Sequence, residues 1–141
     1  MPTPSEIHQQ FVAVFNKRDF VAFKALLHPD YTYTDSNGTV VTGPDAGVAV
    51  AKSLLTAFPD AQTQINSVKT SGDLSYGEFV TKGTQTGPLM GISASGKLVV
   101  VSRCNVIEIK DGLIFREREY MNMLSVLSQI GAFPAPAPTG S

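Results

Sequence analysis

The sequence predicts one α+β domain in which a curved sheet wraps around helices. Apolar residues recur at helical spacing mainly within the first 58 residues, whereas long segments of alternating residues fill most of the second half. Helices followed by consecutive strands are typical of the α+β class, and 141 residues suit one domain. We therefore predict a single domain over residues 1–133, with a cavity inside the wrapped sheet, and a flexible Pro-rich tail over residues 134–141.

The predicted elements follow from periodicity and turn signals. Three segments have apolar residues at helical spacing: residues 5–17, 19–27 and 44–58. A short hairpin is expected over residues 31–42, because Ser-Asn-Gly separates two β-prone runs. Four longer strands are expected in the second half: residues 63–70, 76–84, 98–109 and 113–122. Turn signals at 71–73, 95–97 and 110–112 separate these strands, which predicts antiparallel neighbours. Residues 123–130 are expected to form a last short helix.

Composition excludes several classes of partner. The net charge is −1 and no run of Lys or Arg is present, so we expect neither nucleic acid nor an anionic membrane as a partner. The single cysteine, Cys104, has no internal disulfide partner. No zinc-ligand spacing and no phosphate-binding Gly-rich loop is present, so no metal and no cofactor is expected.

The N-terminus lacks the pattern of a signal peptide, which predicts a cytoplasmic protein.

Four short strings, in this order, resemble the SnoaL-like branch of the nuclear transport factor 2-like superfamily. They are Ala-Phe-Pro-Asp at 57–60, Gly-Thr-Gln-Thr-Gly-Pro at 83–88, Ala-Ser-Gly-Lys at 94–97 and Lys-Asp-Gly-Leu-Ile at 110–114. The resemblance implies a cone-shaped α+β barrel, an interior site for a small hydrophobic molecule, and a homodimer that pairs through the outer sheet face. Phe115 and Met121 are the apolar contacts expected there.

The end of the last strand both supports and limits this resemblance. Residues 116–122 are similar to the phenazine-biosynthesis A/B subgroup. Asn122, however, stands where polyketide cyclases typically have an acid/base Asp, and Gln85 stands where many relatives have His. An amide does not accept a proton as a carboxylate does. The family's cyclase mechanism therefore does not transfer directly to these two positions.

Polar residues on the two longest strands are the candidate substrate contacts. Arg103 and Asn105 interrupt an otherwise apolar row, where Arg103 could bind an oxyanion or pair across the sheet with Glu78 or Glu117. Regular alternation puts Arg118, Tyr120 and Asn122 on one face of the last strand, and the resemblance places that face in the cavity. The alternative is that Tyr120 is a core residue and Asn122 caps the last helix. Phe15 and Tyr33 complete the set of expected substrate contacts: Phe15, Tyr33, Arg103, Asn105, Arg118 and Tyr120.

Two carboxylates are the candidate general bases, with Asn122 as a third catalytic candidate. Asp35 shares a strand face with Tyr33, and Glu78 lies on another strand. An apolar cavity would raise the pKa of either carboxyl toward the range useful for proton transfer. Asp35 also fits a turn in which it caps backbone amides. His8 is expected on the solvent side of the first helix.

The resemblance and these candidates together favour a cofactor-free cyclase or isomerase of specialised metabolism. Its substrate would be a small, hydrophobic polyketide- or terpenoid-like compound. One alternative is a small-molecule binding protein without catalysis, and another is a structural dimer partner in a biosynthetic complex. A further alternative is an epoxide hydrolase-like enzyme, because Arg-x-Asn at 103–105 is similar to the Arg-x-Asp of limonene epoxide hydrolases. Asn105 and Asn122 occupy the two positions where those hydrolases have Asp.

Overall fold

A computed structural model describes residues 1–133 and shows an α+β fold built on one curved, open sheet. The helices are α1 (Pro4–Asn16), α2 (Phe20–Ala25), α3 (Pro44–Ala57) and α4 (Met123–Gln129). The strands are β1 (Leu27–Thr34), β2 (Val40–Thr42), β3 (Gln62–Ser71), β4 (Leu74–Thr84), β5 (Leu98–Lys110) and β6 (Leu113–Met121). The predicted fold class is confirmed. The predicted Pro-rich tail lies outside the described residues.

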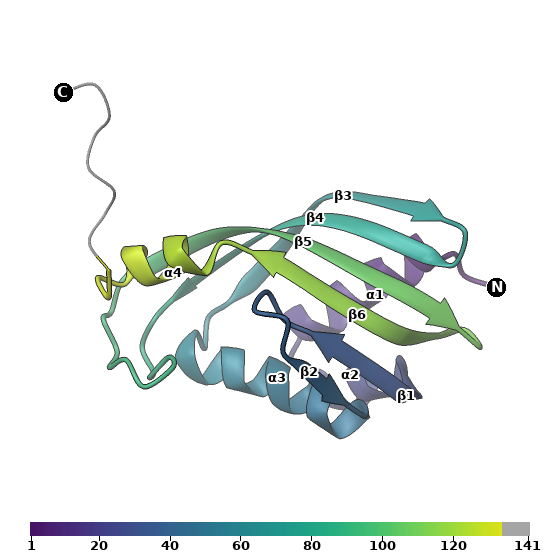
Figure 1. The fold of residues 1–141 in the computed structure, drawn as a ribbon, viewed down its shortest axis with the longest axis horizontal. Helices are drawn as coiled ribbons and strands as arrows, with labels where there is room; N and C mark the ends of the chain where they lie inside the picture. Colours follow the sequence, from purple (N-terminus) through teal and green to yellow (C-terminus); the bar gives the residue numbers. More distant parts are fainter. Residues whose placement is uncertain (134–141) are drawn as a thin grey trace.

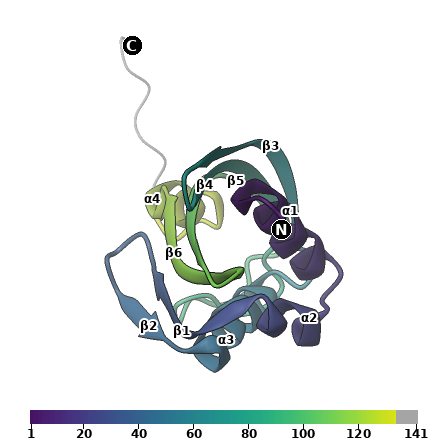
Figure 2. The same cartoon turned by 90° about the vertical axis from the view of Figure 1, so that its right-hand side faces the viewer.

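The six strands lie in the order β2-β1-β6-β5-β4-β3. All neighbours are antiparallel except β1 and β6, which run parallel. The chain between these two strands forms β2, α3, β3, β4 and β5. The sheet curls so that α1 lies within its concave side near β3 and β4, while α3 lies against β1 (Figures 1 and 2). The curvature leaves space between the sheet and these helices.

Helix α1 begins one residue before the predicted segment, and its N-cap is Thr3. The Thr3 hydroxyl accepts from the Glu6 amide, and the Glu6 carboxylate accepts from the Thr3 amide, which together form a capping box. The apolar residues of α1 pack against β1, β5 and β6 in a cluster that includes Ile7, Phe11, Tyr31, Ile107 and Ile114. Among residues 1–133, no helix is long and apolar enough to cross a membrane.

Strand β6 contains a β-bulge that decides which of its residues face the interior. The pairing of β6 with β5 shifts by one residue at Phe115. An inserted residue moves every following side chain to the opposite face of the sheet. Beyond the bulge, the buried side chains are those of Glu117 and Glu119. Arg118 and Tyr120, which regular alternation assigns to the interior, lie on the outer face, so that part of the prediction was wrong.

Candidate functional site

A cavity of about 210 Å³ lies between the concave side of the sheet and helices α1 and α3. Much of its wall is apolar and includes Phe11, Phe15, Phe58 and Val99. Polar side chains from β1, β3, β4, β5 and β6 also line it: Tyr31, Tyr33, Thr63, Thr81, Arg103, Asn105, Glu117 and Glu119. Four predicted substrate contacts, Phe15, Tyr33, Arg103 and Asn105, therefore meet at one cavity.

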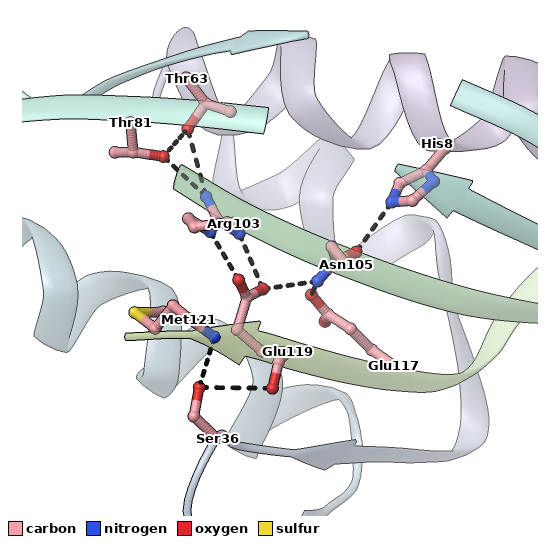
Figure 3. A network of polar contacts seen from close by, with 9 residues as sticks. All are labelled: His8, Ser36, Thr63, Thr81, Arg103, Asn105, Glu117, Glu119 and Met121. Carbon is pink, nitrogen blue, oxygen red and sulfur yellow. Dashed lines mark hydrogen bonds and ion pairs between the residues drawn. The ribbon is translucent and has the colours of Figure 1, made fainter. Parts of the chain in front are cut away.

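Arg103 and Glu119 form a largely buried ion pair across β5 and β6. Arg103 Nε donates to Glu119 Oε1 at 2.7 Å and its terminal nitrogen donates to Oε2 at 2.9 Å, so the pair is bidentate (Figure 3). The same guanidinium donates to Thr81 Oγ1 at 2.8 Å. Burial alone would lower the pKa of Arg103, but the hydrogen bonds and charge of Glu119 hold that pKa above its ordinary value. Arg103 therefore stays charged and pairs with Glu119 rather than with Glu78 or Glu117.

Asn105 links this ion pair to a second carboxylate. Its amide Nδ2 donates to Glu119 Oε2 at 2.6 Å and to Glu117 Oε2 at 2.9 Å (Figure 3). Asn105 is 1% exposed, so both hydrogen bonds are sheltered from water. A side-chain NH2 group has two protons, and here each one is directed at a different carboxylate.

Of the two carboxylates in the site, Glu117 is the one that is not bonded to a cation. Its partners within residues 1–133 are the Asn105 amide and the Tyr31 hydroxyl, which donates to Oε1 at 2.5 Å. Burial, reinforced by the negative charge of Glu119, raises the pKa of Glu117 from 4.5 to about 7, although hydrogen bonds from Tyr31 and Asn105 oppose the shift. Near neutral pH this carboxyl is thus able both to release and to accept a proton.

Tyr33 supplies a hydroxyl beside Glu117. The two residues are register partners on the parallel strands β1 and β6, and both line the cavity. Within the described chain the Tyr33 hydroxyl has no hydrogen-bond partner, unlike that of Tyr31. Burial and the charges of Glu117 and Glu119 raise the pKa of Tyr33. The phenol therefore keeps its proton and is free to donate to a molecule in the cavity.

The matched family and the solved structures agree with this fold. A family model described as SnoaL-like polyketide cyclase matches residues 5–130. The chain belongs to this family. Among curated proteins, none matches the chain in sequence.

Several solved structures share the fold of this SnoaL-like chain. TsrD from Streptomyces laurentii is 27% identical with a TM-score of 0.80, over 90% of this chain and 93% of TsrD. IdmH from Streptomyces antibioticus is 22% identical with a TM-score of 0.81, over 92% of this chain and 98% of IdmH. An LEH-like epoxide hydrolase of M. tuberculosis is 16% identical with a TM-score of 0.71, over 90% of this chain and 88% of the hydrolase.

The two carboxylates predicted as bases of this SnoaL-like protein lie outside the cavity. Asp35 Oδ1 accepts from the Asn37 and Thr39 amides, each at 2.9 Å, so its carboxylate caps a turn as the alternative interpretation proposed. The side chain of Glu78 is exposed on the outer face of β4, where its register partner is Cys104. Neither lines the cavity. Ser36, in the turn at Asp35, is bonded to β6, because its hydroxyl accepts from the Met121 amide at 3.1 Å (Figure 3).

The C-terminal end of β6 also differs from the prediction. Tyr120 is 53% exposed on the outer face, and Arg118 lies on the same face. Asn122 caps α4, because its Oδ1 accepts from the Ser125 amide at 3.1 Å. Met121, expected on the outer face as a dimer contact, lines the cavity instead. The family position that typically holds an acid/base Asp is therefore a helix cap in this chain.

Gln85, at the other departure from the family pattern, is a fully buried structural residue. Its Nε2 donates to the carbonyl oxygens of Ile92 and Ser93, each at 3.3 Å, and its Oε1 accepts from the Ser95 amide at 3.0 Å. These contacts hold the loop between β4 and β5 against the end of β4. A neutral amide that donates and accepts suits this position better than a titratable group.

Sequence reasoning missed Glu117, Glu119 and His8 as site residues. The run Arg-Glu-Arg-Glu at 116–119 puts two arginines on one face of the strand and two glutamates on the other, so polarity alone gives no indication of which pair points inward. The signal that could have identified the inward pair is Arg103 on the neighbouring strand, because a buried arginine requires a carboxylate beside it. His8 was expected to face solvent, but it is 0% exposed and hydrogen-bonded to Asn105. Among residues 1–133, no cluster of three or more His, Cys, Asp or Glu side chains is placed to hold a metal ion.

Proposed function

We propose that this protein is a cyclase or isomerase that binds a small, hydrophobic carbonyl compound and moves a proton with Glu117 as the base. The observation that carries the proposal is a buried carboxylate that faces an apolar cavity and has no cation bonded to it within the described chain. A general base is most effective when its pKa lies near the working pH. The pKa of about 7 for Glu117 meets that condition.

The chemistry follows from the positions of Glu117 and Tyr33. The Glu117 carboxylate removes a proton from carbon next to the substrate carbonyl, and the electron pair of that C–H bond forms an enolate. The Tyr33 hydroxyl donates to the enolate oxygen and stabilises its charge. In an isomerisation, Glu117 returns the proton to another carbon of the enolate. In a cyclisation, the enolate carbon attacks a second carbonyl carbon, and the new alkoxide takes up the proton.

Cavity size and lining indicate the class of ligand. About 210 Å³ is smaller than the roughly 300 Å³ at which small-molecule sites usually begin. A bicyclic ketone is of the appropriate size, and one carbonyl suffices to use the Tyr33 donor. A charged ligand is disfavoured because Arg103 is already neutralised by Glu119 and the rest of the wall is largely apolar. The homodimer implied by the resemblance stays a prediction.

Deuterium exchange tests this proposal without knowledge of the natural substrate. The α-protons of 1-tetralone and 2-tetralone are followed by NMR in deuterated buffer with and without protein. We expect the wild-type protein to accelerate exchange and Glu117→Gln to slow the protein-dependent rate by at least about 100-fold, as for loss of a general base. Glu78→Gln is the matched control, because this carboxylate lies on the outer face and its loss should leave the rate unchanged.

The other outcomes of this experiment distinguish the alternatives. Equal exchange by wild type and Glu117→Gln contradicts the assignment of the base. Binding of either ketone, seen as shifted protein resonances, without any exchange supports a binding protein that lacks catalysis. A hydrolase remains the second candidate, because Arg103 and two carboxylates meet in the cavity. Conversion of limonene oxide to its diol in oxygen-18 water, with no ketone exchange, would favour it.

A further inference from the structure

His8 lies outside the proposed catalytic group, yet both of its ring nitrogens are used. Nε2 contacts Asn105 Oδ1 at 2.8 Å and Nδ1 contacts Ser75 Oγ at 2.7 Å. The imidazole comes from α1 and is fully buried against the sheet (Figure 3). A buried polar side chain in a helix that otherwise packs apolar residues is costly unless its hydrogen bonds are all made.

The sheet is shaped to admit this imidazole. Gly77 on β4 is the register partner of Asn105 on β5. A Cβ atom at Gly77 would lie 2.9 Å from His8 Cε1 and 2.5 Å from Phe79 Cζ. Phe79 in turn packs edge-on against the His8 ring, with centroids 5.0 Å apart. The missing side chain at position 77 therefore leaves the space through which His8 reaches Asn105.

The hydrogen bonds fix which way round the Asn105 amide lies. Its NH2 group faces the Glu117 and Glu119 carboxylates, and an ionised carboxylate only accepts. Its Oδ1 then faces His8 and needs a donor, so His8 carries its proton on Nε2, and the Ser75 hydroxyl donates to Nδ1. Burial, reinforced by the positive charge of Arg103, lowers the pKa of His8 to about 4. The ring is therefore neutral at neutral pH, as one donor and one acceptor require.

We propose that His8 is a positioning residue that holds the Asn105 amide with its NH2 group toward Glu117 and thereby sets how readily Glu117 gives up its proton. A reversed amide would direct Oδ1 at the carboxylates and remove two donors from them. The charged and titratable groups that face Glu117 directly are Tyr31 and Tyr33 from β1, Arg103 from β5, and Glu119 on its own strand. His8 acts on Glu117 only through Asn105. This inference builds on the proposed base, but its test does not need a substrate.

The test is a carbon-13 NMR titration of the Glu117 carboxyl in protein labelled at the glutamate side-chain carboxyl carbons. The resonance that is absent from Glu117→Gln belongs to Glu117. In His8→Phe we expect its titration midpoint to move up by about one pH unit, the effect of weakening a hydrogen bond to a charged group. His8→Gln should restore a midpoint near that of the wild type, because its amide Nε2 can donate to Asn105 Oδ1. Gln9→Ala, on the exposed side of α1, is the matched control and should leave the midpoint unchanged.

A second variant keeps the inference testable if His8→Phe does not fold. Ser75→Ala removes the hydroxyl that donates to His8 Nδ1 and holds the ring in place, and it should move the midpoint in the same direction by a smaller amount. A folded His8→Phe protein with the wild-type midpoint would overturn the inference, and so would an unchanged midpoint in Ser75→Ala if His8→Phe is unfolded. Absence of ketone exchange in the wild type would refute the proposed base while leaving this titration result intact.

Discussion

Replacing Arg103 with Met is expected to lower the free energy of unfolding by about 3–5 kcal/mol, the usual cost of removing one partner of a buried ion pair. Glu119 is 2% exposed at its side chain and has no other cation within hydrogen-bond distance among residues 1–133. The substitution also leaves the Thr81 hydroxyl without its guanidinium donor. Urea unfolding at neutral pH, followed by circular dichroism, measures the loss.

The matched double variant separates charge from packing. Arg103→Met combined with Glu119→Leu removes both charges, and we expect it to recover much of the lost stability, since paired apolar residues often replace a buried ion pair at little cost. The free energy of unfolding of Arg103→Lys should lie between those of the wild type and Arg103→Met, because lysine keeps the charge and loses the bidentate geometry. A loss in Arg103→Met no larger than that of a surface substitution would contradict the buried ion pair.

The second large effect concerns the pH dependence of stability due to Glu117. Its pKa is raised in the folded protein from 4.5 to about 7. A carboxyl whose pKa is raised by folding favours the folded state when protonated, so its contribution is complete below pH 4.5. That contribution is lost as pH rises through about 7. As pH rises across this range, the free energy of unfolding of the wild type should therefore fall by on the order of 3 kcal/mol relative to that of Glu117→Gln.

The comparison with Glu117→Gln is needed because His8 acts in the opposite direction. The pKa of His8 is lowered from 6.5 to about 4, so its contribution to stability is lost as pH falls through that interval. Both proteins contain His8, so subtracting their unfolding free energies at each pH leaves mainly the contribution of Glu117. If the free energies of unfolding of the two proteins change in parallel between pH 4.5 and 7, Glu117 titrates at its ordinary pKa and the prediction is contradicted.

Much of the fold was predictable because local signals agreed with one another. Alternation along residues 98–109 correctly placed Arg103 and Asn105 on the concave face, since β5 remains regular over that stretch. Turn residues placed most strand ends within a few positions of those observed. The parallel pairing of β1 with β6 was not predictable from the turns, because it joins segments that are about 80 residues apart.

The candidate site was harder to predict, for a reason that lies in β6. A single inserted residue at Phe115 exchanges the two faces of the strand, and the sequence carries no local mark of it. Two arginines and two glutamates alternate after it, so either face is equally polar. The choice is made by long-range complementarity, since Arg103 on β5 can be buried beside Glu119 but not beside another arginine. Asp35 illustrates a different limit, because the same carboxylate suits a turn and a catalytic site equally well.

Infrared difference spectroscopy of Glu117 tests most directly whether the cavity holds a base poised near neutral pH. Wild type and Glu117→Gln are compared in the region where a protonated carboxyl group absorbs. We expect a band that is present in the wild type, absent from the variant, and lost as pH rises through about 7. Loss of that band at the ordinary pKa of glutamate would contradict the assignment of Glu117 as the base.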